Sequence, residues 1–272
     1  MLATVSGLFA VIFYSLSTLL QGRDLLQPRS GSEHEAQRRK VLLFAVLALA
    51  VHLVNVVQVI AIDGGYDFGF FKIATLFSWT IALIVVLSSL KKPLDNLFLA
   101  LFPLAIVSIL SALLLPGSTT PENELSGGVA LHVLLGIAAF SIITIAAVQS
   151  VLVAWLNREL KHKHFSPALR HLPPLQTMEA LLFELIWAGF FTLLGVIVSG
   201  VLFMEDMFAQ HLAHKTFFTL VSTAVFAILL WGRHRLGWRG RLAYRWTLAG
   251  FGFLIVAYFG VKFVLELLLD RA

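Results

Sequence analysis

The chain has 272 residues, of which 59% are hydrophobic and only 13% are charged, and its formal net charge is +5. This composition excludes an ordinary soluble domain, in which about a quarter of the residues are charged. The absence of cysteine also excludes disulfides and thiolate metal sites.

Apolar runs that are long enough to cross a bilayer follow one another along the chain, since a spanning helix needs about 20 apolar residues. In chain order they cover residues 2–21, 41–62, 69–90, 94–115, 128–156, 180–204, 215–232 and 246–269. The first run has no basic residue ahead of it and no small-residue cleavage site after it, so we interpret it as a retained span. The sequence therefore predicts an all-α, polytopic integral membrane protein, with eight transmembrane helices in one bundle and a single domain over residues 1–272.

Lysine and arginine are unevenly distributed between the connections. The connections after the first, third, fifth and seventh runs hold 16 of the 20 basic residues. The positive-inside rule places these connections in the cytoplasm and both termini on the opposite side. Because the basic residues lie at membrane edges, contact with lipid headgroups is favoured over contact with nucleic acid. The arginines of the last basic connection are interpreted as topology anchors: Arg233, Arg235, Arg239, Arg241 and Arg245.

Small residues at helical spacing predict how two spans pack, because helices in lipid associate by close approach and polar contacts. In the fifth span, they predict one packed face made of His132, Gly136, Ala139, Ile143 and Ala147. In the sixth span, they predict a face made of Ala188, Thr192, Gly195 and Ser199.

Three polar residues of the second span lie on one arc of the helix: His52, Asn55 and Gln58. Ionisable groups within spans are costly, so they are candidates for function. Two interpretations are open for this arc. Either it makes hydrogen bonds between helices, or His52 is part of a ligand or proton site.

Further histidines lie at the extracytoplasmic ends of spans. His132 is in the first turns of the fifth span, where a neutral imidazole could be an axial haem ligand or a structural group. His211 and His214 precede the seventh span on the same side and could offer a second ligand, or could be solvated. No nucleotide-binding glycine loop, zinc-protease helix or serine elbow occurs, so we predict no enzyme.

The C-terminal part of the chain resembles a known family. "LLWGRHRLGWRGRLAYRWTLAGFGFLIVAYFGVKFVLELLL" (229–269) is similar to the end of the cytochrome c assembly membrane proteins, where a basic "gWRG" turn precedes "YFGVN". "LHVLLGIAAFSIITIAAVQSVLVAW" (131–155) resembles the histidine-bearing span of that family. "LPPLQTMEALLFELIWAGFFTLLGVIVSG" (172–200) resembles its next span.

The resemblance implies a haem site at the extracytoplasmic face, on histidines that flank a tryptophan-rich loop. His132 matches the first of these histidines, whereas the second falls at Leu269. A membrane-embedded histidine of some members falls at Trp231, and His52 matches its partner on an early span. The segment "FMEDMFAQHLAHKT" (203–216) lacks the tryptophans and the proline of the haem-presenting loop.

The function that the resemblance implies is that of a bacterial inner-membrane protein related to cytochrome c biogenesis factors. Such a protein binds haem at the extracytoplasmic face, through His132 as the iron ligand, and assists haem handling or cytochrome assembly. Its expected partners are cytochrome biogenesis proteins or another membrane protein. The alternative is a structural or regulatory partner protein that kept the scaffold and lost haem presentation.

Overall fold

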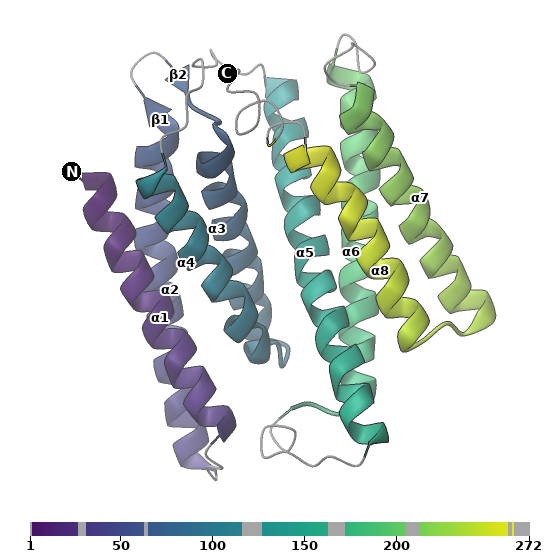
Figure 1. Cartoon of the computed structure of the whole chain (residues 1–272), viewed down its shortest axis with the longest axis horizontal. Coiled ribbons are helices and arrows are strands. Elements are labelled where there is room, and N and C mark those ends of the chain that lie inside the picture. Colours follow the sequence, from purple (N-terminus) through teal and green to yellow (C-terminus); the bar gives the residue numbers. More distant parts are fainter. Residues whose placement is uncertain are drawn as a thin grey trace. The chain divides into compact units, whose positions relative to one another are not determined.

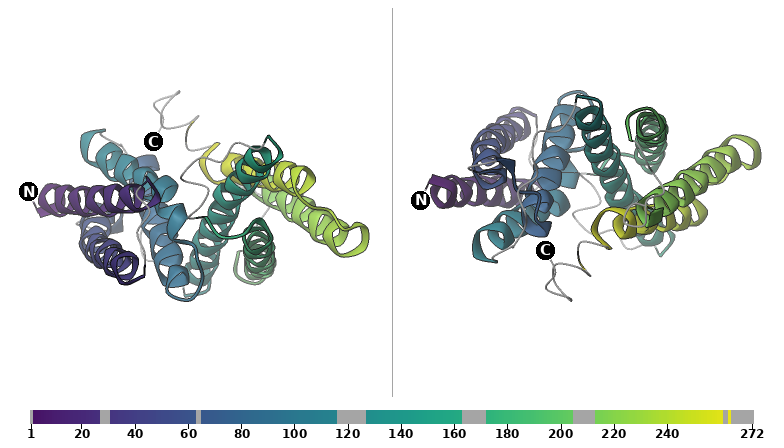
Figure 2. Two further views of the ribbon diagram at one scale, coloured as in Figure 1. Left: turned by 90° about the horizontal axis from the view of Figure 1, so that it is seen from below. Right: turned by 90° about the horizontal axis from the view of Figure 1, so that it is seen from above.

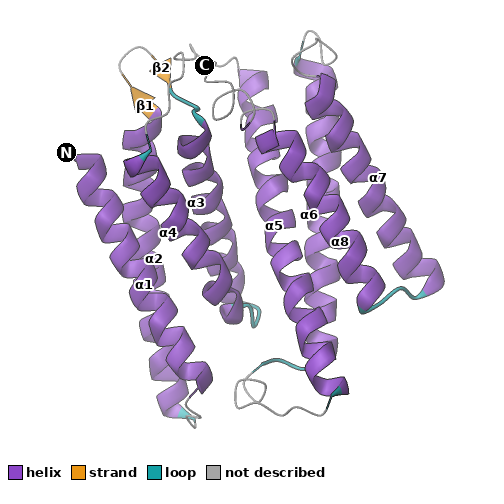
Figure 3. Ribbon diagram, in the orientation of Figure 1, coloured by secondary structure: helices purple, strands orange, loops and turns teal. Residues whose placement is uncertain are grey.

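The computed structural model describes residues 2–26, 31–62, 65–115, 127–162, 172–204, 213–260 and 263. Within these ranges, eight helices are long and apolar enough to cross a membrane (Figures 1 and 3). This confirms the predicted all-α class and the number of spans. The helices are α1 (Leu2–Leu26), α2 (Ser32–Ile60), α3 (Phe70–Ser89), α4 (Phe98–Leu114), α5 (Gly127–Lys161), α6 (Leu175–Phe203), α7 (Ala213–Leu236) and α8 (Arg241–Ile255). The short helix η1 (Asp95–Leu97) leads into α4, and the π-helical turn η3 (Val256–Gly260) continues α8.

Several helices are longer than the apolar runs that predicted them. α2 begins at Ser32, within a charged segment, and carries Glu33 and Glu35 in its first turn, where carboxylates suit the positive end of the helix dipole. α5 ends with Arg158 and Lys161 in its last turn, where basic groups suit the negative end. Hydropathy marks the bilayer and not the helix, so it does not detect these polar extensions.

Contacts between helices divide the chain into two compact units. Unit 1 contains α1 to α4, and unit 2 contains α5 to α8 with η3. In unit 1, α1 packs against α2 and α4, and α3 also packs against α2 and α4 (Figure 2). In unit 2, α5 packs on α6 and α8, and α7 contacts the same two helices. That residues 1–272 form one domain stays a prediction.

The outward faces of the helices are apolar in both units. On α1, Leu8, Phe9 and Ile12 are each about half exposed, and on α6 Phe191 is 61% exposed. A protein in water rarely exposes so much contiguous apolar surface. These faces are therefore suited to lipid, and the helices pair through their opposite faces.

A small hairpin connects α2 to α3 in unit 1 (Figure 3). Strands β1 (Ala61–Ile62) and β2 (Gly65–Tyr66) pair antiparallel, with Ala61 opposite Tyr66. The carboxylate of the following Asp67 accepts a hydrogen bond from the amide of Gly69 at 2.9 Å and pairs with Lys72. Lys72 is one of the few basic residues outside the four basic connections, and Asp67 neutralises it locally.

The face that α5 uses against its neighbours was predicted correctly. Gly136, Ala139, Ile143 and Ala147 are all buried. The closest approach to α6 lies at Gly189, where an added Cβ would lie 2.6 Å from Cγ1 of Ile143.

The predicted face of α6 is partly wrong. Ala188 is exposed and Gly195 is only half-buried, whereas Gly189, Leu193 and Val196 are buried. The buried face is thus displaced by one residue, about 100° around the helix. Small residues occur at helical spacing on two adjacent faces of this apolar helix, so spacing alone does not choose between them. Ser199 is buried, as predicted.

Candidate functional site

His132 lies in the second turn of α5, and its imidazole is held by α6. Its Nδ1 is 3.0 Å from Oγ of Ser199, and the Ser199 hydroxyl donates to the carbonyl oxygen of Val196 at 3.0 Å. A hydroxyl has a single hydrogen, so Oγ of Ser199 accepts a hydrogen bond from Nδ1–H of His132. In this tautomer Nε2 carries the lone pair, which is the form in which histidine binds a metal.

The backbones of α5 and α6 approach closely around this histidine. An added Cβ at Gly128 would lie 2.4 Å from the ring of Phe203, and one at Gly195 would be in van der Waals contact with Leu135. The first turns of α5 are therefore fixed against the last turns of α6. His132 itself is half-buried at this end of unit 2.

Tyr258 is a residue of this region that the sequence reasoning missed. An added Cβ at Gly136, one turn after His132, would lie 2.8 Å from the Tyr258 hydroxyl. The Tyr258 ring is 5.5 Å from the ring of Phe140 on α5. Tyr258 lies in the π-helical turn η3, and such turns are frequent at functional sites. The signal in the sequence that could have indicated Tyr258 is its place in "YFGV", a segment that resembles the family pattern.

His214 is a second imidazole at the same end of unit 2 that could bind a metal. It lies in the first turn of α7, which begins where α6 ends (Figure 1). Its Nε2 is buried and has no hydrogen-bond partner among the residues that the structure describes. His211, which was predicted together with it, lies outside the described residues, as does Leu269.

His52 is completely enclosed within unit 1. Its exposure is 0%, and its Nδ1 is 3.1 Å from the hydroxyl of Tyr14 on α1. The two rings meet edge to face at 5.6 Å, and the Tyr14 ring lies 4.9 Å from that of Phe102 on α4. Nε2 of His52 is buried without a partner within the described ranges.

The other two residues of this arc also bind α1. Asn55 donates to the carbonyl oxygen of Ala3 at 2.7 Å, and Gln58 accepts from the Ser6 hydroxyl at 3.0 Å. All three residues of the predicted arc therefore make hydrogen bonds between helices, as the first of the two interpretations expects.

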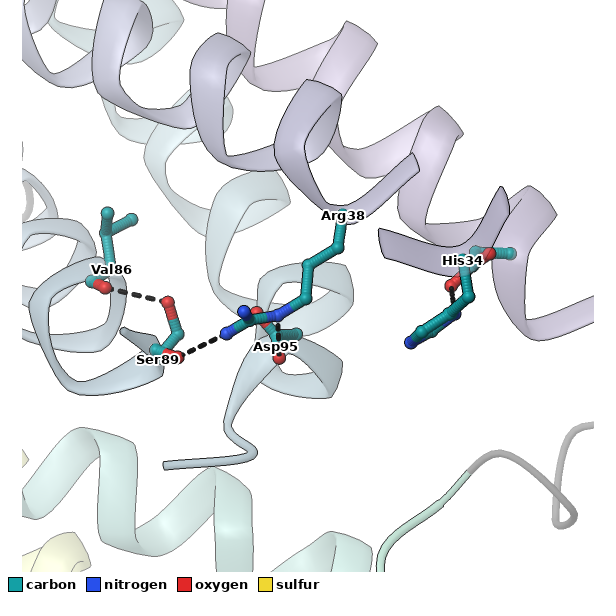
Figure 4. A network of polar contacts seen from close by, with 6 residues as sticks. His34, Arg38, Val86, Ser89 and Asp95 are labelled. Atoms are coloured by element: carbon teal, nitrogen blue, oxygen red, sulfur yellow. Dashed lines mark hydrogen bonds and ion pairs between the residues drawn. The ribbon is translucent and has the colours of Figure 1, made fainter. Parts of the chain in front are cut away.

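A polar network lies at the end of unit 1 where α1 leads into α2 and α3 leads into α4 (Figure 4). The guanidinium of Arg38 on α2 is 3.3 Å from the carboxylate of Asp95, and it donates to the carbonyl oxygen of Ser89 at 2.6 Å. His34 pairs with Asp24 at 2.9 Å. These contacts connect α2 to α1, to α3 and to η1, so several charges at this end are neutralised within the unit.

The five predicted topology anchors lie in the last turn of α7, in the turn that follows it and in the first turns of α8. Only Arg233 packs inward, with its guanidinium 4.5 Å from the centre of the Phe183 ring. The other four are exposed: Arg235, Arg239, Arg241 and Arg245.

Fold and site together define a polytopic helical membrane protein with isolated histidines on its spans. Residues 41–269 match the cytochrome C assembly protein family, and the chain belongs to that family. This confirms the resemblance seen in the sequence.

The relatives of the chain include a protein that matches it over nearly its whole length. Inner membrane protein YpjD of Escherichia coli strain K12 is 27% identical over 266 residues, which cover 97% of this chain and 99% of YpjD. An uncharacterized 28.8 kDa protein of Azospirillum brasilense is 35% identical over 141 residues, which cover 51% of this chain and 52% of that protein. Protein HemX of Brevibacillus brevis is 24% identical over 131 residues, or 47% of this chain and 48% of HemX. No solved structure matches the chain.

The resemblance implies haem, which needs an imidazole nitrogen with a free lone pair and an open side for its ring. His132 fits this requirement better than His52, because Ser199 holds its Nδ1–H and the residue is half-buried and not enclosed. His52 does not fit, because helices α1 and α4 enclose it on the sides that a porphyrin would occupy. In the described ranges, no three His, Asp or Glu side chains converge on a possible metal position.

Proposed function

We propose that this protein is a multi-pass protein of the bacterial inner membrane that binds haem at its extracytoplasmic face and assists haem handling in cytochrome c assembly. Its family and its relatives, an inner membrane protein and a HemX protein, support this role. The observation that carries the proposal is the chain of hydrogen bonds from His132 through Ser199 to Val196. The proposed role is binding and transfer, without a catalysed reaction.

The charge distribution supports the orientation. The basic ends of α5 and α7, with Lys161 and Arg235 in their last turns, belong in the cytoplasm by the positive-inside rule. The end with His132 and His214 then faces the extracytoplasmic side, and both termini lie on that side too.

Each residue of the site has a distinct task in this proposal. Ser199 holds Nδ1–H of His132 and so presents the Nε2 lone pair outward. Val196 holds the hydroxyl of Ser199 in the accepting orientation. Haem, if bound, would supply an iron that binds imidazole nitrogens, and His132 would hold it. His214 or His211 offers the second nitrogen, because the family position for it reads Leu269.

A second candidate is a membrane partner protein without haem. The observations that favour it are the segment 203–216, which lacks the tryptophans of the haem-presenting loop, and the enclosed His52. In this case the hydrogen bond between His132 and Ser199 has only a packing role between α5 and α6. The two candidates differ in whether haem binds saturably.

Titration of the detergent-purified protein with haemin tests the proposal. We expect a saturable Soret band for the wild type and its loss in His132→Ala. His234→Ala is the matched control, because His234 is exposed at the opposite end of α7 and should titrate like wild type. A shifted spectrum in the double variant His211→Ala with His214→Ala identifies the second ligand. If the wild type shows no saturable change, or His132→Ala matches it, the partner-protein function replaces the haem function.

A further inference from the structure

The arginines of the turn between α7 and α8 fall into two sets. Arg233 has a local role, because it stacks on Phe183 and donates to the carbonyl oxygen of Trp238 at 3.3 Å. Each member of the other set is exposed, and none forms an ion pair with a carboxylate of the described residues. This set consists of Arg235, Arg239, Arg241 and Arg245.

The backbone that carries these four side chains is held in one conformation. The amide of Trp238 donates to the carbonyl oxygen of Gly232 at 3.2 Å, and an added Cβ at Gly232 would lie 2.4 Å from the Trp238 ring. The rings of Trp238 and Trp246 are 5.5 Å apart. Gly240 has a left-handed backbone, with φ of 54°, and its amide donates to the carboxylate of Glu179 on α6 at 3.2 Å. The turn is therefore preorganised, and this carboxylate binds its backbone and not an arginine.

The four exposed arginines of this turn form no ion pair with a described carboxylate, in contrast to Arg38 at the basic end of unit 1. Residues 229–246 contain five arginines and no aspartate or glutamate. In unit 1, by comparison, Asp95 pairs with Arg38, and Glu33 and Glu35 lie on the same helix. α8 also begins at Arg241 without a side-chain cap, so its first turn adds a positive dipole end.

Exposed apolar side chains alternate with these arginines. Trp231 and Leu236 are each 58% exposed, and Leu242 is 45% exposed. A nucleic acid would neutralise the guanidinium groups but would not cover Leu236 and Leu242. A phospholipid satisfies both, because its phosphate meets the arginines and its acyl chains cover the apolar residues.

We propose that the turn between α7 and α8 is a binding site for the phosphate headgroup of an anionic phospholipid. The four exposed arginines hold the phosphate by charge-assisted hydrogen bonds, which the planar guanidinium makes in pairs. The acyl chains run along Trp231, Leu236 and Leu242. This site lies at the opposite end of α7 from His214 and does not depend on haem binding.

Binding of phosphatidylglycerol to the purified full-length chain tests the proposal. Retained lipid is counted by native mass spectrometry, and the dissociation constant follows from a titration in mild detergent. One variant removes the four exposed charges of the turn: Arg235→Gln, Arg239→Gln, Arg241→Gln and Arg245→Gln. The matched control removes four exposed charges from unit 1: Arg23→Gln, Arg39→Gln, Lys40→Gln and Lys91→Gln.

The turn variant should bind phosphatidylglycerol at least about tenfold more weakly than wild type, since each basic group near a membrane surface contributes about 1 kcal/mol. The unit 1 control should bind like wild type. An equal loss in both variants would show general charge attraction and overturn the site. If the fourfold variant does not fold, the double variant Arg241→Gln with Arg245→Gln tests the same point and should show an intermediate loss. Unchanged binding in that folded variant contradicts the proposal.

Two further probes identify the source of the phosphate. Phosphatidylcholine should be retained much less than phosphatidylglycerol, because its headgroup has no net charge. Soluble glycerophosphoglycerol, which carries the same headgroup without acyl chains, should not compete at equal concentration. Equal retention of phosphatidylcholine, or full competition by the soluble headgroup, would contradict a lipid site.

Discussion

Unit 1 has His52 within α2 and unit 2 has His132 near the start of α5, and these two histidines differ in what surrounds their second nitrogen. In both cases a hydroxyl from a neighbouring helix holds Nδ1: that of Tyr14 for His52 and that of Ser199 for His132. His52 is 0% exposed, whereas His132 is half-buried near the start of its helix. A polar group within a span is therefore not sufficient for a ligand site. A ligand can approach only where one side of the imidazole is left open by the neighbouring helices.

The charged ends of the two units differ in a parallel way. In unit 1, Arg38 and His34 each meet a carboxylate of the same unit (Figure 4). In unit 2, four of the five arginines in and around the turn between α7 and α8 are exposed. Unit 1 thus pairs Arg38 and His34 internally, while unit 2 leaves the exposed arginines of this turn available for binding.

The largest expected effect comes from the contact between α5 and α6 at Gly189. In Gly189→Ala, the added methyl group would lie 2.6 Å from buried Ile143, so the helices must separate. We expect a loss of about 2 kcal/mol in the free energy of unfolding. The thermal midpoint in detergent measures it.

Gly195→Ala is the matched control for this substitution. Its added methyl group meets Leu135 at 3.7 Å, which is an ordinary contact. Because alanine favours helix over glycine by about 1 kcal/mol, this variant should be neutral or more stable. Equal losses at the two positions would show that the packed face of α6 is misplaced.

A smaller effect should follow from Tyr14→Phe in unit 1. This change leaves Nδ1 of His52 without its partner in the described structure. Hydrogen bonds between helices in membranes average about 0.6 kcal/mol and reach about 1.7 kcal/mol, so we expect a loss near 1 kcal/mol. Tyr244→Phe is the control, on half-buried Tyr244 of α8. Haem binding should stay unchanged in Tyr14→Phe; its loss would show that His52 contributes to the site.

The smallest effect is expected for Arg38→Gln, which removes the ion pair with Asp95. Because the Arg38 side chain is 38% exposed, solvent screens the pair, and the loss should be about 1 kcal/mol or less. The loss should also diminish as the salt concentration rises. Arg39→Gln removes an exposed neighbouring charge and should leave the melting temperature unchanged. The same loss in both variants would mean that the network has no specific role.

Hydropathy predicted the number and the order of the spans because the bilayer sets a minimum length of apolar residues. It did not predict where the helices end, since α2 continues into a charged segment as far back as Ser32. It also did not determine how α6 is rotated, because small residues such as Gly189 and Gly195 lie on both of two adjacent faces of this apolar helix. Rotation depends on which neighbouring side chain must be accommodated, here Ile143.

The candidate site was only partly predictable. The position of His132 at a helix end followed from the sequence, and Ser199 was expected to face a neighbouring helix. Their direct hydrogen bond could not be predicted, because it depends on the register of α5 against α6. The approach of Tyr258 to Gly136 depends on the π-helical turn, for which the sequence has no clear pattern.

Chemical rescue of His132→Gly tests most directly the central claim that His132 supplies the axial nitrogen. The variant, purified in detergent, is titrated with haemin first alone and then with free imidazole. The predicted result is that the Soret band is lost and that imidazole restores it, while His52→Phe binds haemin like wild type. An unchanged band in His132→Gly, or a band lost in His52→Phe and kept in His132→Gly, would contradict the assignment of the haem site to unit 2.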